Sequence, residues 1–144
     1  MAASIVFDDS LWPLLVSRFE GQVSDEAYEE YLLQGALYLR RGEPYVSVLD
    51  TARLALPTAR QRQRQFEWLR QHEQPMRELL LGCAFIITSP FIRMTMSTVF
   101  HLMPMPTPYV AVQDMARAVT WATDRLRDAG HAEAAAGILE RFHR

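Results

Sequence analysis

Short apolar runs alternate with longer amphipathic segments along the chain. Runs at residues 5–7 and 14–19 are bracketed by turn residues, and their close spacing predicts two neighbouring strands that pair antiparallel. Residues 45–49 have the strongest strand pattern, and their near-continuous apolar character predicts a central strand covered on both faces. Residues 83–88 and 109–112 predict two further strands.

Helical patterns fill the stretches between these strands. Ser24 is predicted to cap a first helix that ends just before Gly42, a C-terminal glycine signal. Thr58 is predicted to begin a second helix, with Gln61 as its capping-box partner, and Pro75 to break it. The ranges predicted as helical are 24–41, 58–75, a further turn at 79–81, 89–102, 114–129 and 132–142, with a loop at 52–57.

This order of elements is typical of the α/β class. We predict a sheet of about five strands, mostly parallel, with flanking helices and with the first strand at an antiparallel edge. A chain of 144 residues has room for one core, so we predict one domain at 1–130 and a C-terminal helical extension at 131–144. The longest apolar run, residues 79–88, is too short to span a bilayer, and the first residues show no secretory pattern. We therefore expect a cytoplasmic protein with no membrane span.

The ordering of elements, the chain length and the strand at 45–50 resemble the STAS fold of sulfate-transporter and anti-sigma-factor-antagonist domains. Residues 19–25 are similar to the family's strand followed by glycine, a hydrophobic residue and the first helix. Residues 83–93 and the strand–helix pair at 109–121 fit the rest, so that the resemblance covers about 4–128. It implies a non-enzymatic bacterial protein, regulatory or scaffolding, that acts by protein–protein interaction.

One motif of that family is altered in this chain. Anti-sigma antagonists usually carry an Asp-Ser-Ser-Gly-type motif at the start of the second helix, where a partner kinase phosphorylates a serine. Residues 56–60 read Leu-Pro-Thr-Ala-Arg instead, without the glycine, and Thr58 is the only hydroxyl. Thr58 is thus the candidate phospho-acceptor, because a helix N-terminus favours phosphate. The alternative is that Thr58 only caps the helix.

Composition removes several kinds of chemistry. All fifteen basic residues are Arg, which excludes a Schiff-base lysine and a P-loop. The single Cys83 excludes a disulfide within the chain and a cysteine-rich zinc site, and the four histidines show no helical pair spacing. We expect no metal, no cofactor and, since no acid, base and nucleophile combine convincingly, no enzymatic activity.

Charge is distributed unevenly along the chain. Residues 1–52 hold three Arg and nine acidic residues, a net of −6, whereas residues 53–78 hold six Arg and three Glu, a net of +3. Such polarity favours docking of an acidic protein partner or homodimer contact; the alternative is an ordinary solvated helix face. The total of −2 argues against nucleic-acid binding. The predicted partner-binding residues are Asp50, Thr51, Thr58, Arg60, Arg62 and Arg64.

Methionines gather in the segment that follows the fourth strand. Met94 lies in a predicted helix, while Met103 and Met105 lie in a proline-rich stretch that cannot continue it. Flexible methionines suit core gaps, adaptable interfaces or apolar ligands. We favour the core for Met94 and the lip of a pocket or interface for Met103 and Met105; the three methionines Met94, Met103 and Met105 are together the candidates for an apolar pocket or interface. The alternative function is therefore a small carrier of an apolar ligand or lipid.

Overall fold

The computed structural model describes residues 4–55, 57–102 and 104–143. Five strands form one sheet in the order β1-β2-β3-β4-β5; β1 is antiparallel to β2, and every other pair is parallel. The predicted α/β fold with a mostly parallel sheet and an antiparallel edge strand is confirmed. The elements are β1 (Ser4–Leu11), β2 (Leu14–Gly21), α1 (Asp25–Arg40), β3 (Tyr45–Leu54), α2 (Ala59–Gln71), α3 (Glu73–Leu79), β4 (Leu80–Ile86), α4 (Pro90–Leu102), β5 (Tyr109–Val112), α5 (Met115–Asp128) and α6 (Ala132–Phe142).

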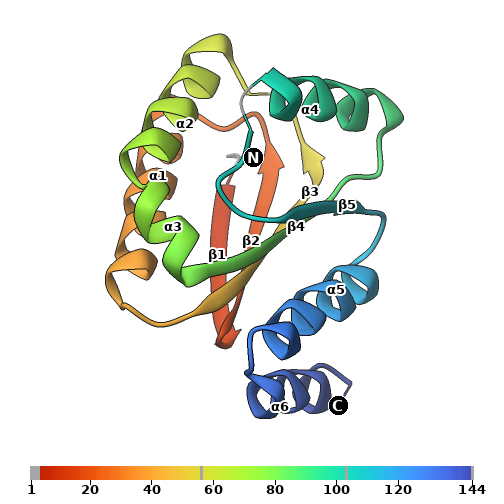
Figure 1. Cartoon of the computed structure of the whole chain (residues 1–144). Coiled ribbons are helices and arrows are strands. Elements are labelled where there is room, and N and C mark those ends of the chain that lie inside the picture. The colour runs from red at the N-terminus through yellow and green to blue at the C-terminus, as the bar shows by residue number, and fades with distance from the viewer. Residues whose placement is uncertain (1–3, 56, 103, 144) are drawn as a thin grey trace.

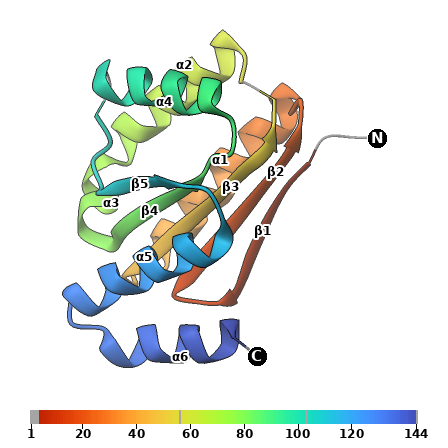
Figure 2. The same cartoon turned by 90° about the vertical axis from the view of Figure 1, so that its right-hand side faces the viewer.

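The helices cover both faces of the sheet. Helices α1 to α4 lie over one face, and α5 and α6 lie over the other (Figures 1 and 2). Side chains along the inner strands alternate between these faces, because successive residues of a strand point to opposite sides. Val46 and Val48 pack toward α5 and α6, while Tyr45 lies among the residues on the α1–α4 side.

The face covered by α5 and α6 is tightly packed. Small side chains of α5, among them Ala118 and Ala122, let the helix approach the strands closely, and Leu126 is fully buried between them. The helix predicted as a C-terminal extension takes part in this packing. Ala135 and Ile138 of α6 are fully buried in the same cluster.

The strand ends differ from the sequence prediction. β3 continues to Leu54, so that residues 52–54, predicted as loop, are strand; the long β2 supplies their pairing partner, with Gly21 opposite Leu54. β4 begins at Leu80, where a helical turn was predicted. Gly82 lies inside this strand rather than ending a helix. The position suits glycine because a Cβ there would come within 2.8 Å of the Trp121 ring.

The break between the second and third helices lies before Pro75. α2 ends at Gln71 and α3 begins at Glu73, which places Pro75 in the first turn of the new helix. Proline is tolerated there because those N–H groups have no intrahelical acceptor, whereas further into a helix its ring would collide with the carbonyl four residues earlier. The predicted break is therefore confirmed, a few residues earlier in the chain.

Candidate functional site

The first residues of α2 form a capped helix start. The Thr58 hydroxyl accepts a hydrogen bond from the Gln61 N–H at 3.1 Å, and the Gln61 side chain accepts one from the Thr58 N–H at 3.3 Å. This is the predicted capping box. Gln61 is itself buried and donates to the Val23 carbonyl at 2.8 Å, which ties α2 to the end of β2. The Thr58 side chain thus has a structural role and is also exposed.

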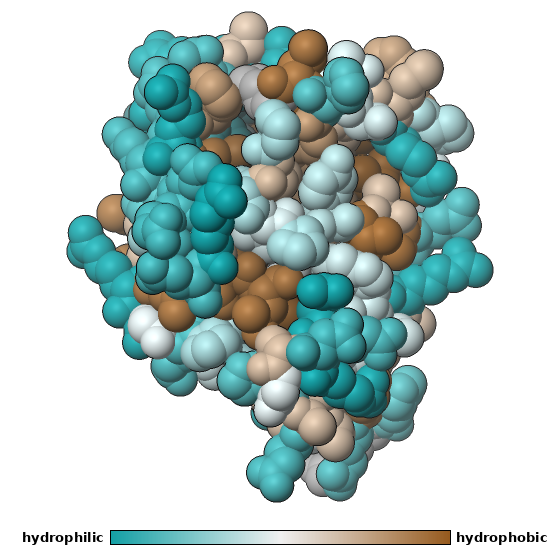
Figure 3. All heavy atoms as spheres, viewed as in Figure 1, coloured by the Kyte–Doolittle hydropathy of each residue, from teal (hydrophilic) through white to brown (hydrophobic). Residues whose placement is uncertain are grey.

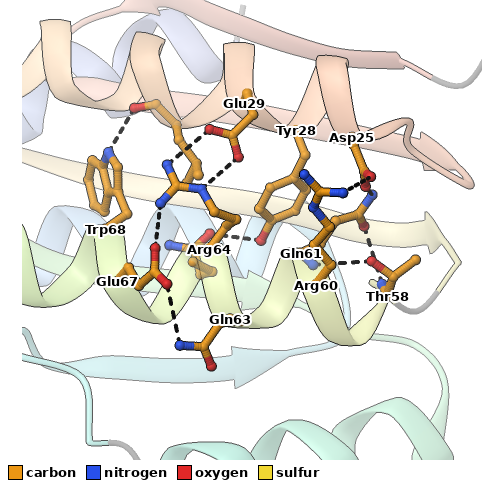
Figure 4. A network of polar contacts seen from close by, with 12 residues as sticks. Asp25, Tyr28, Glu29, Thr58, Arg60, Gln61, Gln63, Arg64, Glu67 and Trp68 are labelled. Carbon is orange, nitrogen blue, oxygen red and sulfur yellow. Dashed lines mark hydrogen bonds and ion pairs between the residues drawn. The ribbon is translucent and has the colours of Figure 1, made fainter.

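The basic segment of α2 lies against the acidic face of α1 (Figure 4). Arg64 donates to both carboxylate oxygens of Glu29 at 2.9 Å and to Glu67 at 2.6 Å. The Arg64 guanidinium lowers the pKa of both carboxyl groups, mainly through these hydrogen bonds. Arg60 lies 3.9 Å from Asp25. Part of the charge polarity along the chain is therefore matched inside the molecule.

The predicted partner-binding residues do not form one loop. Asp50 and Thr51 lie within β3, not in a loop at its end. Thr51 is buried and donates to the Ile86 carbonyl at 2.8 Å, so its side chain is used within the sheet. Arg62 donates to the Pro57 carbonyl at 2.9 Å. Of the predicted residues, three are exposed close together at the start of α2: Thr58, Arg60 and Arg62.

A cavity of about 250 Å³ lies between the sheet and the helices on its α1–α4 side. Strands β1 to β4 supply its floor, and α1, α2 and α4 supply most of its walls. The lining is predominantly apolar and includes aromatic side chains such as Phe19, Phe66 and Phe85. Among its described lining residues the only charged one is Arg62, which is exposed.

Helix α4 closes one side of this cavity. None of its thirteen residues, all of which the structure describes, is fully buried. Ile92, Met96 and Phe100 line the cavity. Hydrophobic residues interrupt the hydrophilic surface in the upper part of Figure 3, where α4 lies. The outward hydrophobic residues of α4 are Phe91, Met94 and Leu102, which are 63%, 65% and 73% exposed.

The methionine predictions have mixed outcomes. Met94 was predicted in the core, and that prediction is wrong, because its side of α4 faces outward and Met96, two residues on, points inward. Met105 lines the cavity, as expected of a pocket lip. Met103 lies outside the described residues.

Hydroxyl groups on the cavity floor were not identified from the sequence. Ser17 of β2 and Ser47 of β3 are buried and line the cavity, together with Tyr45. The sequence does hold a signal for them: strand alternation puts Ser17 on the same face as Leu15, and Ser47 on the same face as Leu49. Polar residues at inward positions of a buried strand indicate a polar partner or a ligand.

The buried thiol and two of the phenols in the cavity lining are held in their neutral forms. Burial raises the pKa of the Cys83 thiol to about 12 and raises the pKa of Tyr31 and Tyr45 above its usual range. A thiol with so high a pKa is a poor nucleophile. Within the described ranges, no group of three His, Cys, Asp or Glu residues could hold a metal ion, and no helix is long and apolar enough to cross a membrane.

Comparison with known proteins supports the fold. No protein-family model and no curated protein matches the sequence. A solved structure does match: an uncharacterized protein of the DUF3478 family, with a SpoIIAA-like fold, from Shewanella loihica PV-4. The TM-score is 0.61 at 17% sequence identity, over 84% of this chain and 94% of that one. The SpoIIAA-like fold is the STAS-like fold, so the predicted STAS-like architecture is confirmed.

Proposed function

We propose that this STAS-like domain binds a small apolar ligand in the cavity under α4, without catalysing a reaction. The observation that carries the proposal is the cavity of about 250 Å³ with its mainly apolar lining. A concave pocket with a mainly apolar lining and a few polar groups is the usual form of a small-molecule site.

The apolar lining of the cavity supports a ligand. Apolar surface that a ligand removes from water contributes roughly 25 cal/mol per Å² to the free energy of binding. A ligand that covered this lining would gain that free energy from apolar surface that the ligand-free protein leaves open to solvent.

The size of the cavity and its chemistry indicate the class of ligand. Pockets for small molecules measure roughly 300–1,000 Å³, so a volume near the lower limit suits a small or slender molecule. The neutral Cys83 thiol offers no activated nucleophile, which favours carriage or sensing over reaction. The protein would act in the bacterial cytoplasm.

Native mass spectrometry of the purified protein, followed by titration with 1-octanol, tests this function. Val99→Trp adds bulk to a residue that lines the cavity, whereas Met94→Trp adds the same side chain to the outer side of α4. We expect Val99→Trp to lose the ligand and Met94→Trp to keep it, with both proteins folded by circular dichroism. The proposal fails if the wild type binds neither a co-purified ligand nor 1-octanol, or if Val99→Trp binds like the wild type.

A second candidate function is protein–protein interaction through the start of α2, in a regulatory or scaffolding role. The supporting observation is that Arg60, whose side chain is 81% exposed, lies on the surface with Arg62 and the phosphorylatable Thr58 hydroxyl. An acidic protein or a second copy of the chain would suit this surface, whereas nucleic acid would not. Asp50 belongs to the same predicted set, and Arg64 contributes less because it is engaged by α1.

A pull-down with Arg60→Ala/Arg62→Ala tests this second function. Arg117→Ala, an exposed arginine of α5, is the matched control for removing surface charge. Loss of a specific partner in the double variant but not in the control would support the interaction. Retention of every partner in both proteins would refute it.

A further inference from the structure

Four hydroxyl-bearing side chains line the cavity on three different elements. Ser17 comes from β2, Tyr31 from α1, and Tyr45 and Ser47 from β3. Ser17, Tyr45 and Ser47 are only 2%, 4% and 7% exposed. Polar groups buried to this degree normally have hydrogen-bond partners.

These four hydroxyls have no hydrogen-bond partner among the residues that the structure describes. Over the same residues, the Arg125 Nε is the only side-chain nitrogen or oxygen that is both inaccessible to solvent and without a hydrogen-bond partner. The four hydroxyls are therefore not sealed, and they border the open volume of the cavity that their residues line.

The other hydroxyls of the cavity wall have partners. The Tyr28 hydroxyl donates to the Gln65 side chain at 2.9 Å. Thr51, on the same face of β3 as Ser47, donates to the Ile86 carbonyl, and Thr95 of α4 donates to the Phe91 carbonyl. Among the lining hydroxyls that the structure describes, the unpartnered ones are thus those on the inner part of β2, β3 and α1.

The unpartnered groups are close to one another on the sheet. Ser47 lies beside Leu15 of β2, and Ser17 is two residues further along the same strand and face. Tyr45 precedes Ser47 by two residues and so points to the same side. Tyr31 comes from the opposite wall, near enough to Tyr45 and Cys83 that each raises its pKa.

We propose that the cavity selects an apolar ligand carrying one uncharged hydrogen-bonding group, such as an alcohol or a ketone, and that Ser17, Tyr31, Tyr45 and Ser47 hold this group. The inference rests on the proposed ligand-binding function and specifies its ligand class. Each hydroxyl can donate to a ligand oxygen and can also accept from a ligand hydroxyl. A ligand oxygen at these positions keeps the hydroxyls hydrogen-bonded when the apolar part of the ligand excludes solvent from the cavity, whereas a pure hydrocarbon would leave them without partners.

The lining disfavours a charged ligand group. A carboxylate beside the four hydroxyls would lose its hydration without meeting a positive charge. Arg62, the only charged residue among those described in the lining, is exposed, and its guanidinium donates to the Pro57 carbonyl. An ionised acid could use Arg62 only by keeping its head away from the hydroxyl cluster.

Titration with octane, 1-octanol, 2-octanone and octanoate tests this selectivity, because the four probes share a chain and differ in their polar group. Calorimetry at neutral pH should show 1-octanol and 2-octanone binding about ten-fold more tightly than octane, as expected for one or two new hydrogen bonds. Octanoate should bind more weakly than 1-octanol.

Variants then assign the effect to the hydroxyls. Ser17→Ala/Ser47→Ala and Tyr45→Phe should reduce the preference for 1-octanol over octane to about two-fold or less, with octane affinity nearly unchanged. Tyr28→Phe, which removes an already partnered hydroxyl, should keep the preference. The inference is overturned if octane binds as tightly as 1-octanol, or if the preference for 1-octanol survives both hydroxyl variants. Either result leaves the proposed ligand-binding function standing.

Preferential binding of octanoate through Arg62, or binding of none of the probes, would also contradict the inference. If octanoate binds more tightly than 1-octanol and loses this advantage in Arg62→Gln, the ligand group is anionic and the inference is wrong. If none of the four probes binds, the proposed function fails and this inference fails with it.

Discussion

Tyr28 and Tyr45 both line the cavity and are both buried, but only Tyr28 has a partner for its hydroxyl. The same Tyr→Phe substitution at both positions therefore isolates the value of that partner. We expect Tyr28→Phe to destabilise the ligand-free protein and Tyr45→Phe to leave its stability unchanged or higher. The aromatic ring, and so the apolar packing, is retained in both variants.

The magnitudes follow from the contacts of each hydroxyl. The 2.9 Å bond from Tyr28 to Gln65 is worth about 0.5–1.5 kcal/mol net, so Tyr28→Phe should lower the free energy of unfolding by about 1 kcal/mol. The Tyr45 hydroxyl has no partner among the described residues, so removing it breaks no hydrogen bond within the protein and should cost little. We expect the two variants to differ by about 1 kcal/mol, or about 3 °C in Tm for a chain of this length.

Urea unfolding of ligand-free protein measures this difference, provided that the variants share one m-value. Tyr31→Phe is the third member of the set and should behave like Tyr45→Phe. If Tyr45→Phe lowers the free energy of unfolding as much as Tyr28→Phe does, the Tyr45 hydroxyl is already hydrogen-bonded in the ligand-free protein. The reasoning from unpartnered hydroxyls would then be refuted, whatever the cavity binds.

Four further predictions concern single positions. Gly82→Ala should lower the free energy of unfolding by about 1–3 kcal/mol, because its Cβ would lie 2.8 Å from the Trp121 ring. Gly137→Ala, where a Cβ would meet nothing within 4 Å, should raise the free energy of unfolding by up to about 1 kcal/mol through its higher helix propensity. Urea unfolding measures both changes. Thr58→Ala should lose about 1 kcal/mol in the same assay by removing the cap. Burial raises the pKa of Cys83 from 9.0 to about 12, so its contribution to stability is complete below pH 9 and is lost as pH rises toward 12. Cys83→Ala should flatten that alkaline fall in Tm, and an identical fall in the variant would contradict the assignment.

The order of the elements could be predicted because its signals are local. Ser24, Thr58 and Asp114 were each expected at a helix start, and each side chain accepts a hydrogen bond from the backbone N–H three residues on. Such bonds form within one turn, so the neighbouring sequence is enough to predict them. The near-continuous apolar character of residues 45–49 likewise predicted that β3 is covered on both faces, as the structure shows.

Features that depend on contacts between distant segments could not be predicted from the sequence. The end of β3 depends on the length of β2, and the role of Gly82 depends on Trp121, which is 39 positions away in the sequence. The ion pair between Arg64 and Glu29 joins residues 35 positions apart. The charge polarity that predicted a partner is therefore partly used inside the chain, and only the folded structure shows this.

Two apolar stripes compete along α4. One holds Phe91, Met94 and Leu102, which face outward, and the other holds Ile92, Met96, Val99 and Phe100 at i, i+4, i+7 and i+8, which line the cavity. The sequence contains the inward stripe, and the prediction of Met94 in the core followed the wrong one of the two. A cavity is still harder to predict, because it is the small volume left after many side chains have packed. Inward serines such as Ser47 are the part of the site that the sequence does show.

The two sides of the sheet differ in how firmly they hold their helices. On the α5–α6 side, small residues such as Ala118 and Ala122 allow dense packing, and Leu14, Val46 and Val48 are fully buried there. On the other side, α4 contributes no fully buried residue and borders the cavity. Local opening free energies are lowest where few apolar contacts hold an element. We therefore expect backbone hydrogen exchange to be faster in α4 than in α5, and equal exchange in the two helices would contradict this reading of the packing.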